Sequence, residues 1–128
     1  MDLLLDSHSF IWWREEPGKL SKNAYAEISN SANNIFLSVA SIWEIQIKII
    51  NKKFAFSEKL VDVIIDEQIN NGFQLLPVNL PHALYLENLP FHHKDPFDRL
   101  LISQAIVENM TLVSADAQFS NYQVNLLC

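Results

Sequence analysis

The sequence contains a single cysteine, Cys128, and only two glycines and five prolines among 128 residues. One thiol cannot form an internal disulfide, so nothing indicates an oxidising compartment. No apolar run approaches the ~20 residues of a membrane-spanning helix. No basic residue precedes the apolar residues 3–5, as a secretory signal would require. We therefore expect a cytoplasmic protein that does not associate with a membrane.

Positive charge is also scarce. Nine Lys and Arg residues stand against fifteen Asp and Glu residues, which gives a formal net charge of −6. This balance argues against broad, non-specific adhesion to nucleic acid, which a basic surface normally drives. Apolar residues, in contrast, make up 49% of the chain. Since the length is typical of one folding unit, we expect a single domain over residues 1–128 with its own core.

Short apolar segments alternate with segments of helical periodicity. The segments predicted to be strands are residues 3–6, 35–38, 73–78, 111–114 and 124–127. Helix signals lie between them: Ser21 and Ser57 are typical N-caps, Asn71-Gly72 is a typical stop, and Pro96 suits a first turn. Strands that are apolar on both faces and alternate with helices indicate an α/β fold, with a parallel sheet covered on both sides.

Four acidic residues are predicted to meet at one edge of this sheet. Asp6 ends the first strand, and Asp116 follows the strand at 111–114. Glu44 and Asp98 lie in the first turns of two helices. The carboxyl ends of parallel strands share the edge where ligands usually bind. Two carboxylates about 4 Å apart repel by roughly 4 kcal/mol at an effective dielectric of ~20, so the cluster predicts a cation site, and oxygen ligands favour Mg²⁺ or Mn²⁺ over zinc.

Helix capping explains each acid, taken alone, equally well. Ser41 and Glu44 have the spacing of a capping box. Asp95 is a typical N-cap, and Asp98 would be favoured by the helix dipole. The two acids at strand ends could cap the segments that follow them. What capping leaves unexplained is why successive strands end at an acid on the same edge.

Four stretches of the sequence resemble PIN-domain ribonucleases of the VapC toxin type. They are Leu3-Leu4-Leu5-Asp6-Ser7-His8, Ser38-Val39-Ala40-Ser41-Ile42-Trp43-Glu44-Ile45, His93-Lys94-Asp95-Pro96-Phe97-Asp98-Arg99-Leu100-Leu101-Ile102 and Leu112-Val113-Ser114-Ala115-Asp116. The resemblance implies a PIN-like three-layer sandwich, with a mostly parallel central sheet and helices on both faces. It also implies that divalent metal is held for RNA hydrolysis.

The resemblance assigns roles to individual residues. It implies that four acids bind Mg²⁺, or Mn²⁺, and are catalytic: Asp6, Glu44, Asp98 and Asp116. Ser7 and Ser114 stand where the family often has Thr, and they keep its hydroxyl; the expected role is to orient carboxylates or water. Capping for Ser7 and solvation for Ser114 are nearly equal alternatives. Asp95 is an additional acid beside the site, and its preferred role is the helix cap.

Three basic residues near the acids could bind RNA phosphates: Lys48, Lys94 and Arg99. The alternative for each lysine is a solvated surface position, and Arg99 could instead form an ion pair with Asp98. Trp43 is expected in the core or in a dimer interface rather than stacked on a base. The adjacent His92 and His93 lack the spacing of a zinc site, so we expect loop residues there.

The function implied by the resemblance is a metal-dependent endoribonuclease that acts as the toxin of a toxin–antitoxin pair. The implied partners are an RNA substrate, a small VapB-like antitoxin and a second copy of the chain. A catalytically silent PIN-fold protein that binds RNA or a partner is the alternative, and the intact set of acids counts against it. A phospho-receiver domain is disfavoured because no lysine follows Lys94.

Overall fold

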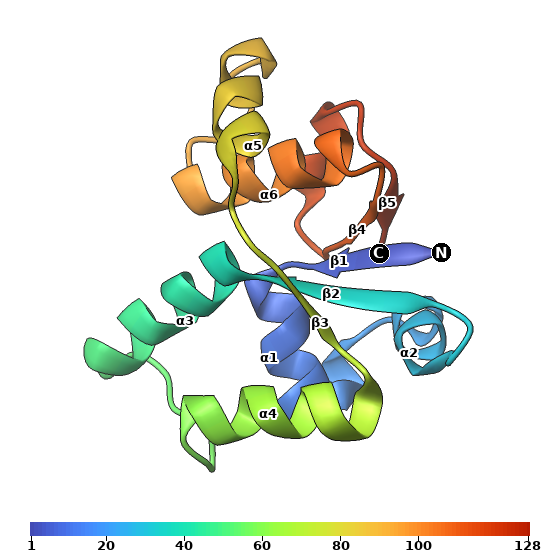
Figure 1. Cartoon of the computed structure of the whole chain (residues 1–128), viewed down its shortest axis with the longest axis vertical. Helices are drawn as coiled ribbons and strands as arrows, with labels where there is room; N and C mark the ends of the chain where they lie inside the picture. The colour runs from blue at the N-terminus through green and yellow to red at the C-terminus, as the bar shows by residue number, and fades with distance from the viewer.

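The computed structural model describes residues 1–128 and contains one five-stranded parallel sheet (Figure 1). Its strands are β1 (Asp2–Leu5), β2 (Asn34–Ser38), β3 (Gln74–Leu76), β4 (Thr111–Val113) and β5 (Leu126–Leu127). The strand order is β3-β2-β1-β4-β5, and every neighbouring pair is parallel. The predicted α/β fold with a parallel sheet is thus confirmed. Strand β1 lies at the centre of the sheet, and its three leucines are fully buried.

Helices cover both faces of the sheet. They are α1 (Ser7–Glu15), α2 (Lys22–Ser29), α3 (Val39–Ile50), α4 (Leu60–Asn71), α5 (Leu80–Tyr85) and α6 (Pro96–Val107), with 3-10 turns η1 (Pro17–Lys19), η2 (Leu86–Asn88) and η3 (Ala117–Asn121). Leu3 and Leu5 pack in one core cluster with α1 to α4, whereas Leu4 packs with α6 and η3 in a second cluster. This alternation along β1 confirms the predicted three-layer sandwich, whose two helical layers are separate in Figure 1.

Helix ends mostly follow the predicted signals. The Ser21 side chain accepts a hydrogen bond from the amide of Ala24, as an N-cap should. Gly72 ends α4 with φ = 66°, a left-handed conformation that favours glycine. The prediction for Ser57 was wrong, because α4 begins at Leu60 and Ser57 donates its amide and hydroxyl to Glu15.

The capping box of Ser41 and Glu44, the alternative role for Glu44, does not form, and this affects the acidic edge. Strand β2 runs directly into α3, so Ser38 is the N-cap and accepts from the Ala40 amide. Ser41 then lies inside the helix, where its buried hydroxyl has no hydrogen-bond partner. Glu44 is consequently not used as a cap and can face the sheet edge.

A partly buried ion-pair network connects α1 to α4 and the segment before it. Arg14 bridges Glu58, Asp66 and Glu67, and the indole of Trp13 donates to Glu67 at 2.7 Å. Hydrogen bonding to Arg14 lowers the pKa of the Asp66 carboxyl. The network fixes α1, which begins at the acidic edge, against the neighbouring helix. No helix combines the length and the apolar character needed to cross a bilayer.

Candidate functional site

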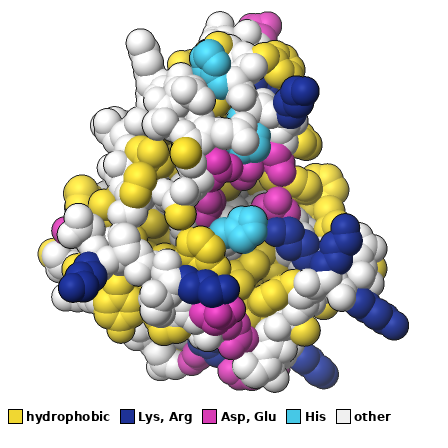
Figure 2. All heavy atoms as spheres, turned by 180° about the vertical axis from the view of Figure 1, so that it is seen from behind, with side chains coloured by type: hydrophobic (Ala, Val, Ile, Leu, Met, Phe, Trp, Pro, Cys, Tyr) yellow, Lys and Arg dark blue, Asp and Glu magenta, His cyan; other side chains and the backbone are white.

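The four predicted acids are carried to one edge of the sheet by four different elements. Asp6 follows β1 and caps α1 by accepting from the Ser9 amide at 2.8 Å. Asp116 follows β4 and caps η3. Both acids line one open cavity of about 300 Å³. Figure 2 shows acidic side chains gathered in a hollow, with Lys and Arg side chains to either side of it. Asp6 and Asp116 therefore cap the segments that follow them and also lie at the same edge of the sheet, so the two roles are not alternatives.

Glu44 and Asp98 complete the cluster from the helices. Glu44 lies in α3 and accepts a hydrogen bond from the Ser7 hydroxyl. Asp98 is the third residue of α6, a helix capped by Asp95, whose carboxylate accepts from the amides of Phe97 and Asp98. The negative charges of Glu44 and Asp6 both act on Asp98, which places the three carboxylates in one electrostatic cluster.

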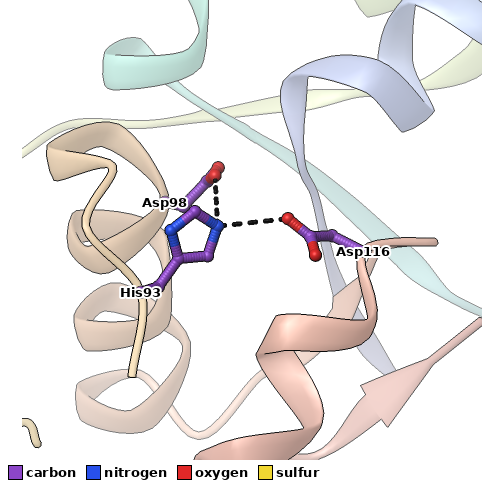
Figure 3. Close-up of side chains that lie close together, drawn as sticks. All are labelled: His93, Asp98 and Asp116. Atoms are coloured by element: carbon purple, nitrogen blue, oxygen red, sulfur yellow. Dashed lines mark hydrogen bonds and ion pairs between the residues drawn. The ribbon is translucent and has the colours of Figure 1, made fainter. Parts of the chain in front are cut away.

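His93 joins two of these acids, as Figure 3 shows. Its Nε2 lies 3.0 Å from Asp98 Oδ2 and 3.1 Å from Asp116 Oδ2. The amide of Asp95 donates to His93 Nδ1 at 3.1 Å. Because Nδ1 accepts a hydrogen bond, a ring hydrogen lies on Nε2, which donates to Asp116 and lies within ion-pair distance of Asp98. The Nε2 of His93 therefore connects the two carboxylates.

The sequence did not reveal this role of His93. The pattern His92-His93 predicted loop residues, and His93 does lie outside any helix or strand, but it is buried at 8% exposure. Its position depends on Tyr122, whose hydroxyl accepts from the amides of His92 and His93. The one signal available in the sequence was its position two residues before Asp95, at the start of the helix.

The site raises the pKa of the Asp98 carboxyl from 3.8 to about 7. Burial is the largest cause, and the nearby charges of Asp95, Glu44 and Asp6 add to it, whereas the His93 ring opposes the rise. Without a cation, charge on Asp98 is thus unfavourable in the folded protein. A cation bound among the acids would remove this cost.

The donor atoms of this cluster fit a hard divalent cation. Carboxylate oxygens of Asp98 and Asp116 lie within 4.8 Å of one another beside His93, and carboxylate oxygens are the preferred ligands of Mg²⁺ and Mn²⁺. The groups around the acids restrict their positions. Ser7 bonds to Glu44, and the Ser114 hydroxyl accepts from the amide of Asp116 at 3.0 Å.

The three predicted phosphate-binding residues have different environments. Lys94 is exposed beside His93, and Lys48 lies one helical turn after Glu44; neither forms an ion pair. Arg99 is buried, and its guanidinium donates to the carbonyl oxygens of Pro90, Leu86 and Leu89. This placement argues against the expected contact of Arg99 with substrate, because the guanidinium already donates its hydrogen bonds to these carbonyl oxygens. The alternative ion pair with Asp98 is not formed either, since Asp98 pairs with His93.

Trp43 does not lie in the core, the first of the two positions predicted for it, and a place in a dimer interface stays a prediction. It is 63% exposed, and its ring lies edge-on to Phe97 at a centroid distance of 5.2 Å. Because Phe97 directly precedes Asp98, Trp43 lies on the surface close to the acids. An aromatic ring at that place is available for contact with a ligand or a partner.

The sequence matches the PIN domain family over residues 3–125, nearly the whole chain. The protein therefore belongs to the PIN domain family, as the four sequence stretches indicated. No curated protein matches the chain in sequence.

Solved structures match the fold over almost their full length. The structure of VapBC2 from Rickettsia felis with a promoter DNA fragment contains a chain with a TM-score of 0.76 and 18% identity, covering 99% of this chain and 98% of that one. DNA-bound VapBC from Salmonella typhimurium gives 0.69 and 12%, covering 99% and 97%. VapBC-5 from Mycobacterium tuberculosis, of the VapBC family of toxin-antitoxin systems, gives 0.60 and 13%, covering 98% and 95%. At identities of 12–18%, the similarity to these structures shows a shared fold alone.

Proposed function

We propose that the protein is a metal-dependent endoribonuclease that uses Mg²⁺ or Mn²⁺ to hydrolyse RNA. The proposed catalytic and metal-binding residues are Asp6, Glu44, Asp98 and Asp116. The observation that carries the proposal is that side chains from four elements of a PIN-family fold converge, with burial and negative neighbours raising the pKa of Asp98. Such a perturbed carboxyl in an open hollow is typical of a functional site.

The chain's own residues would prepare the site for its reaction. When bound, the ion supplies an activated water and neutralises charge on the phosphate. Ser7 holds Glu44 in place, and the Asp95 cap fixes the first turn of α6 and with it Asp98. His93, whose Nε2 is hydrogen-bonded to Asp116 and lies 3.0 Å from Asp98, would fix the spacing of these two carboxylates. Lys48 and Lys94 would bind phosphates along the RNA at the margin of the acidic hollow.

Cleavage of structured RNA tests this function. Wild-type protein is incubated with Mg²⁺, with Mn²⁺ or with EDTA, and Asp6→Asn is compared with Glu87→Gln, which changes an exposed carboxylate of η2 outside the cluster. We expect cleavage with metal only, at least a hundredfold loss in Asp6→Asn and none in Glu87→Gln. Cleavage in EDTA, or full activity in Asp6→Asn, would refute the mechanism. RNA binding without turnover would instead support a silent PIN-fold protein.

We further propose that the enzyme is the toxin of a toxin–antitoxin pair. Its fold matches chains of solved VapBC structures, one of them described as a toxin–antitoxin system. A groove of about 690 Å³ between α3 and α4 is lined mainly by apolar side chains, among them Ile42, Ile49 and Ile64. Val61, which lines it, is 58% exposed. We assign this groove to an apolar helix of a small VapB-like antitoxin.

Co-expression with the neighbouring small gene tests the partner. We expect its product to co-purify with the wild-type chain and to block RNA cleavage. Val61→Asp places a charge in the groove at an exposed position, so it should abolish co-purification while the free variant still cleaves RNA. Equal co-purification with Val61→Asp would contradict the assignment of the groove.

We also propose that the free chain forms a homodimer. Light scattering of the free chain measures its mass, and the mass of a monomer would contradict this proposal.

A further inference from the structure

A second cavity, distinct from the acidic hollow, lies beside the segment that carries His93. Its volume is about 440 Å³, within the range of small-molecule sites. Tyr85, His92 and Tyr122 contribute aromatic rings to its lining, and no Lys, Arg, Asp or Glu side chain lines it. In a chain with a net charge of −6, a cavity without charged side chains fits a neutral ligand.

Three amide side chains also line the cavity: Asn88, Asn121 and Gln123. All three residues are exposed, and none of their amide groups is hydrogen-bonded to another group of the protein. Each amide offers donors and acceptors side by side. Amides of this kind pair with the edges of nucleobases, and aromatic rings stack on their faces. The exposed ring of His92, the half-buried ring of Tyr85 and the free amides therefore match a planar, polar, neutral group, whereas the buried Tyr122 forms the wall of the cavity.

The cavity is mechanically linked to the acidic cluster. The Tyr122 hydroxyl accepts from the amides of His92 at 3.1 Å and His93 at 2.8 Å. The ring of His92 lies at 5.2 Å from that of Tyr122 and belongs to the cavity, whereas the next ring, His93, bonds to Asp98 and Asp116. His92 thus lines the cavity, and the next residue, His93, contacts two acids of the cluster. A ligand that occupies both the cavity and the acidic cluster would carry a neutral planar group next to a charged group.

We infer that this cavity, defined by Asn88, Asn121 and Gln123 with Tyr85, His92 and Tyr122, binds an unpaired nucleobase of the RNA next to the phosphate that is cut. The inference rests on the proposed ribonuclease function for the identity of its ligand. Single-stranded RNA is read by stacking and by hydrogen bonds to exposed base edges. The acidic hollow would position the phosphate, and the amides would determine which base lies beside it.

The first test measures binding without catalysis. Side-chain amide signals of ¹⁵N-labelled protein in EDTA are followed by NMR while adenosine, cytidine, guanosine or uridine is added. We expect at least one nucleoside to shift the signals of Asn88, Asn121 and Gln123 and to leave the exposed Asn125 unchanged. Because this measurement needs neither metal nor turnover, it is independent of the proposed function. Absence of any shift in the three amides with all four nucleosides would overturn the inference.

The second test measures sequence preference. A pool of single-stranded RNAs is cut by wild-type protein, by the double variant Asn121→Ala/Gln123→Ala, and by Asn125→Ala as the matched control. We expect the double variant to lose about tenfold in preference at one base beside the cut, and Asn125→Ala to keep the wild-type preference. An unchanged preference in an active double variant overturns the base site and leaves the ribonuclease function intact. Nucleoside binding by a protein that cuts no RNA supports the base site and refutes the ribonuclease function.

Discussion

Asparagine at position 98 should stabilise the metal-free protein at neutral and alkaline pH. Asp98→Asn keeps the shape of the side chain and removes its charge. In the folded protein the pKa of Asp98 is raised from 3.8 to about 7. Between these values the native state holds a proton that the unfolded chain has released, so the free energy of unfolding falls as pH rises from about 4 to 7 and is level above that.

The size of this effect follows from the same pKa difference. At about 1.4 kcal/mol per pKa unit, the difference between 3.8 and about 7 sets an upper limit of about 4 kcal/mol. Because the side chain of Asp98 is 19% exposed and water screens part of its interactions, we expect about 2 kcal/mol. Wild type and Asp98→Asn should be nearly equal in stability at pH 4.5, and the variant should be more stable at pH 8.

Urea unfolding followed by circular dichroism, in EDTA at several pH values, measures this difference. Glu87→Gln is the control, because it removes an exposed carboxylate outside the cluster and should follow the wild-type pH profile. Mn²⁺ at a hundred times its dissociation constant should then stabilise wild type at pH 8 by about 2.7 kcal/mol and the variant by much less. Parallel pH profiles for wild type and Asp98→Asn would refute the electrostatic description of the site.

Three further changes have distinct expected outcomes. His93→Ala removes the ring between Asp98 and Asp116 and should weaken Mn²⁺ binding by about 10–100-fold in calorimetry. His93→Gln can still donate a hydrogen bond and should lose less Mn²⁺ affinity. An equal loss of affinity in both variants would contradict the donor role. Arg14→Ala leaves the buried Glu67 without its cation and should cost about 3 kcal/mol of unfolding free energy in urea, and a loss below 1 kcal/mol would count against the network. Lys94→Ala should leave stability unchanged and raise KM for RNA. The slope of log KM against log salt concentration should fall by about one, the contribution of one phosphate contact. An unchanged slope would remove Lys94 from the proposed phosphate contacts.

The sheet and the convergence of the acids could be predicted because both follow from local patterns. The leucines of β1 are apolar on both faces, which identifies a central strand of a parallel sheet. Asp6 directly follows β1, and Asp116 follows β4 after two further residues, so parallel pairing of β1 and β4 brings them to the same edge. No knowledge of distant contacts is needed for either conclusion.

The residues that were misjudged depend on contacts between distant segments. His93 enters the site because Tyr122, far along the chain, binds its backbone amide. Arg99 is buried because carbonyl oxygens of residues 86–90 surround its guanidinium. The helix cap moved from Ser41 to Ser38 because β2 joins α3 without a loop. Neither residue spacing nor helix propensity carries this information.

The central claim is that the four carboxylates form a divalent metal site. Anomalous X-ray diffraction from crystals of the protein soaked in Mn²⁺ locates the ion directly. We expect a peak within coordination distance of Asp98 and Asp116, and its loss in crystals of Asp98→Asn. A peak at another place, or no peak at a Mn²⁺ concentration that saturates binding in solution, would contradict the claim.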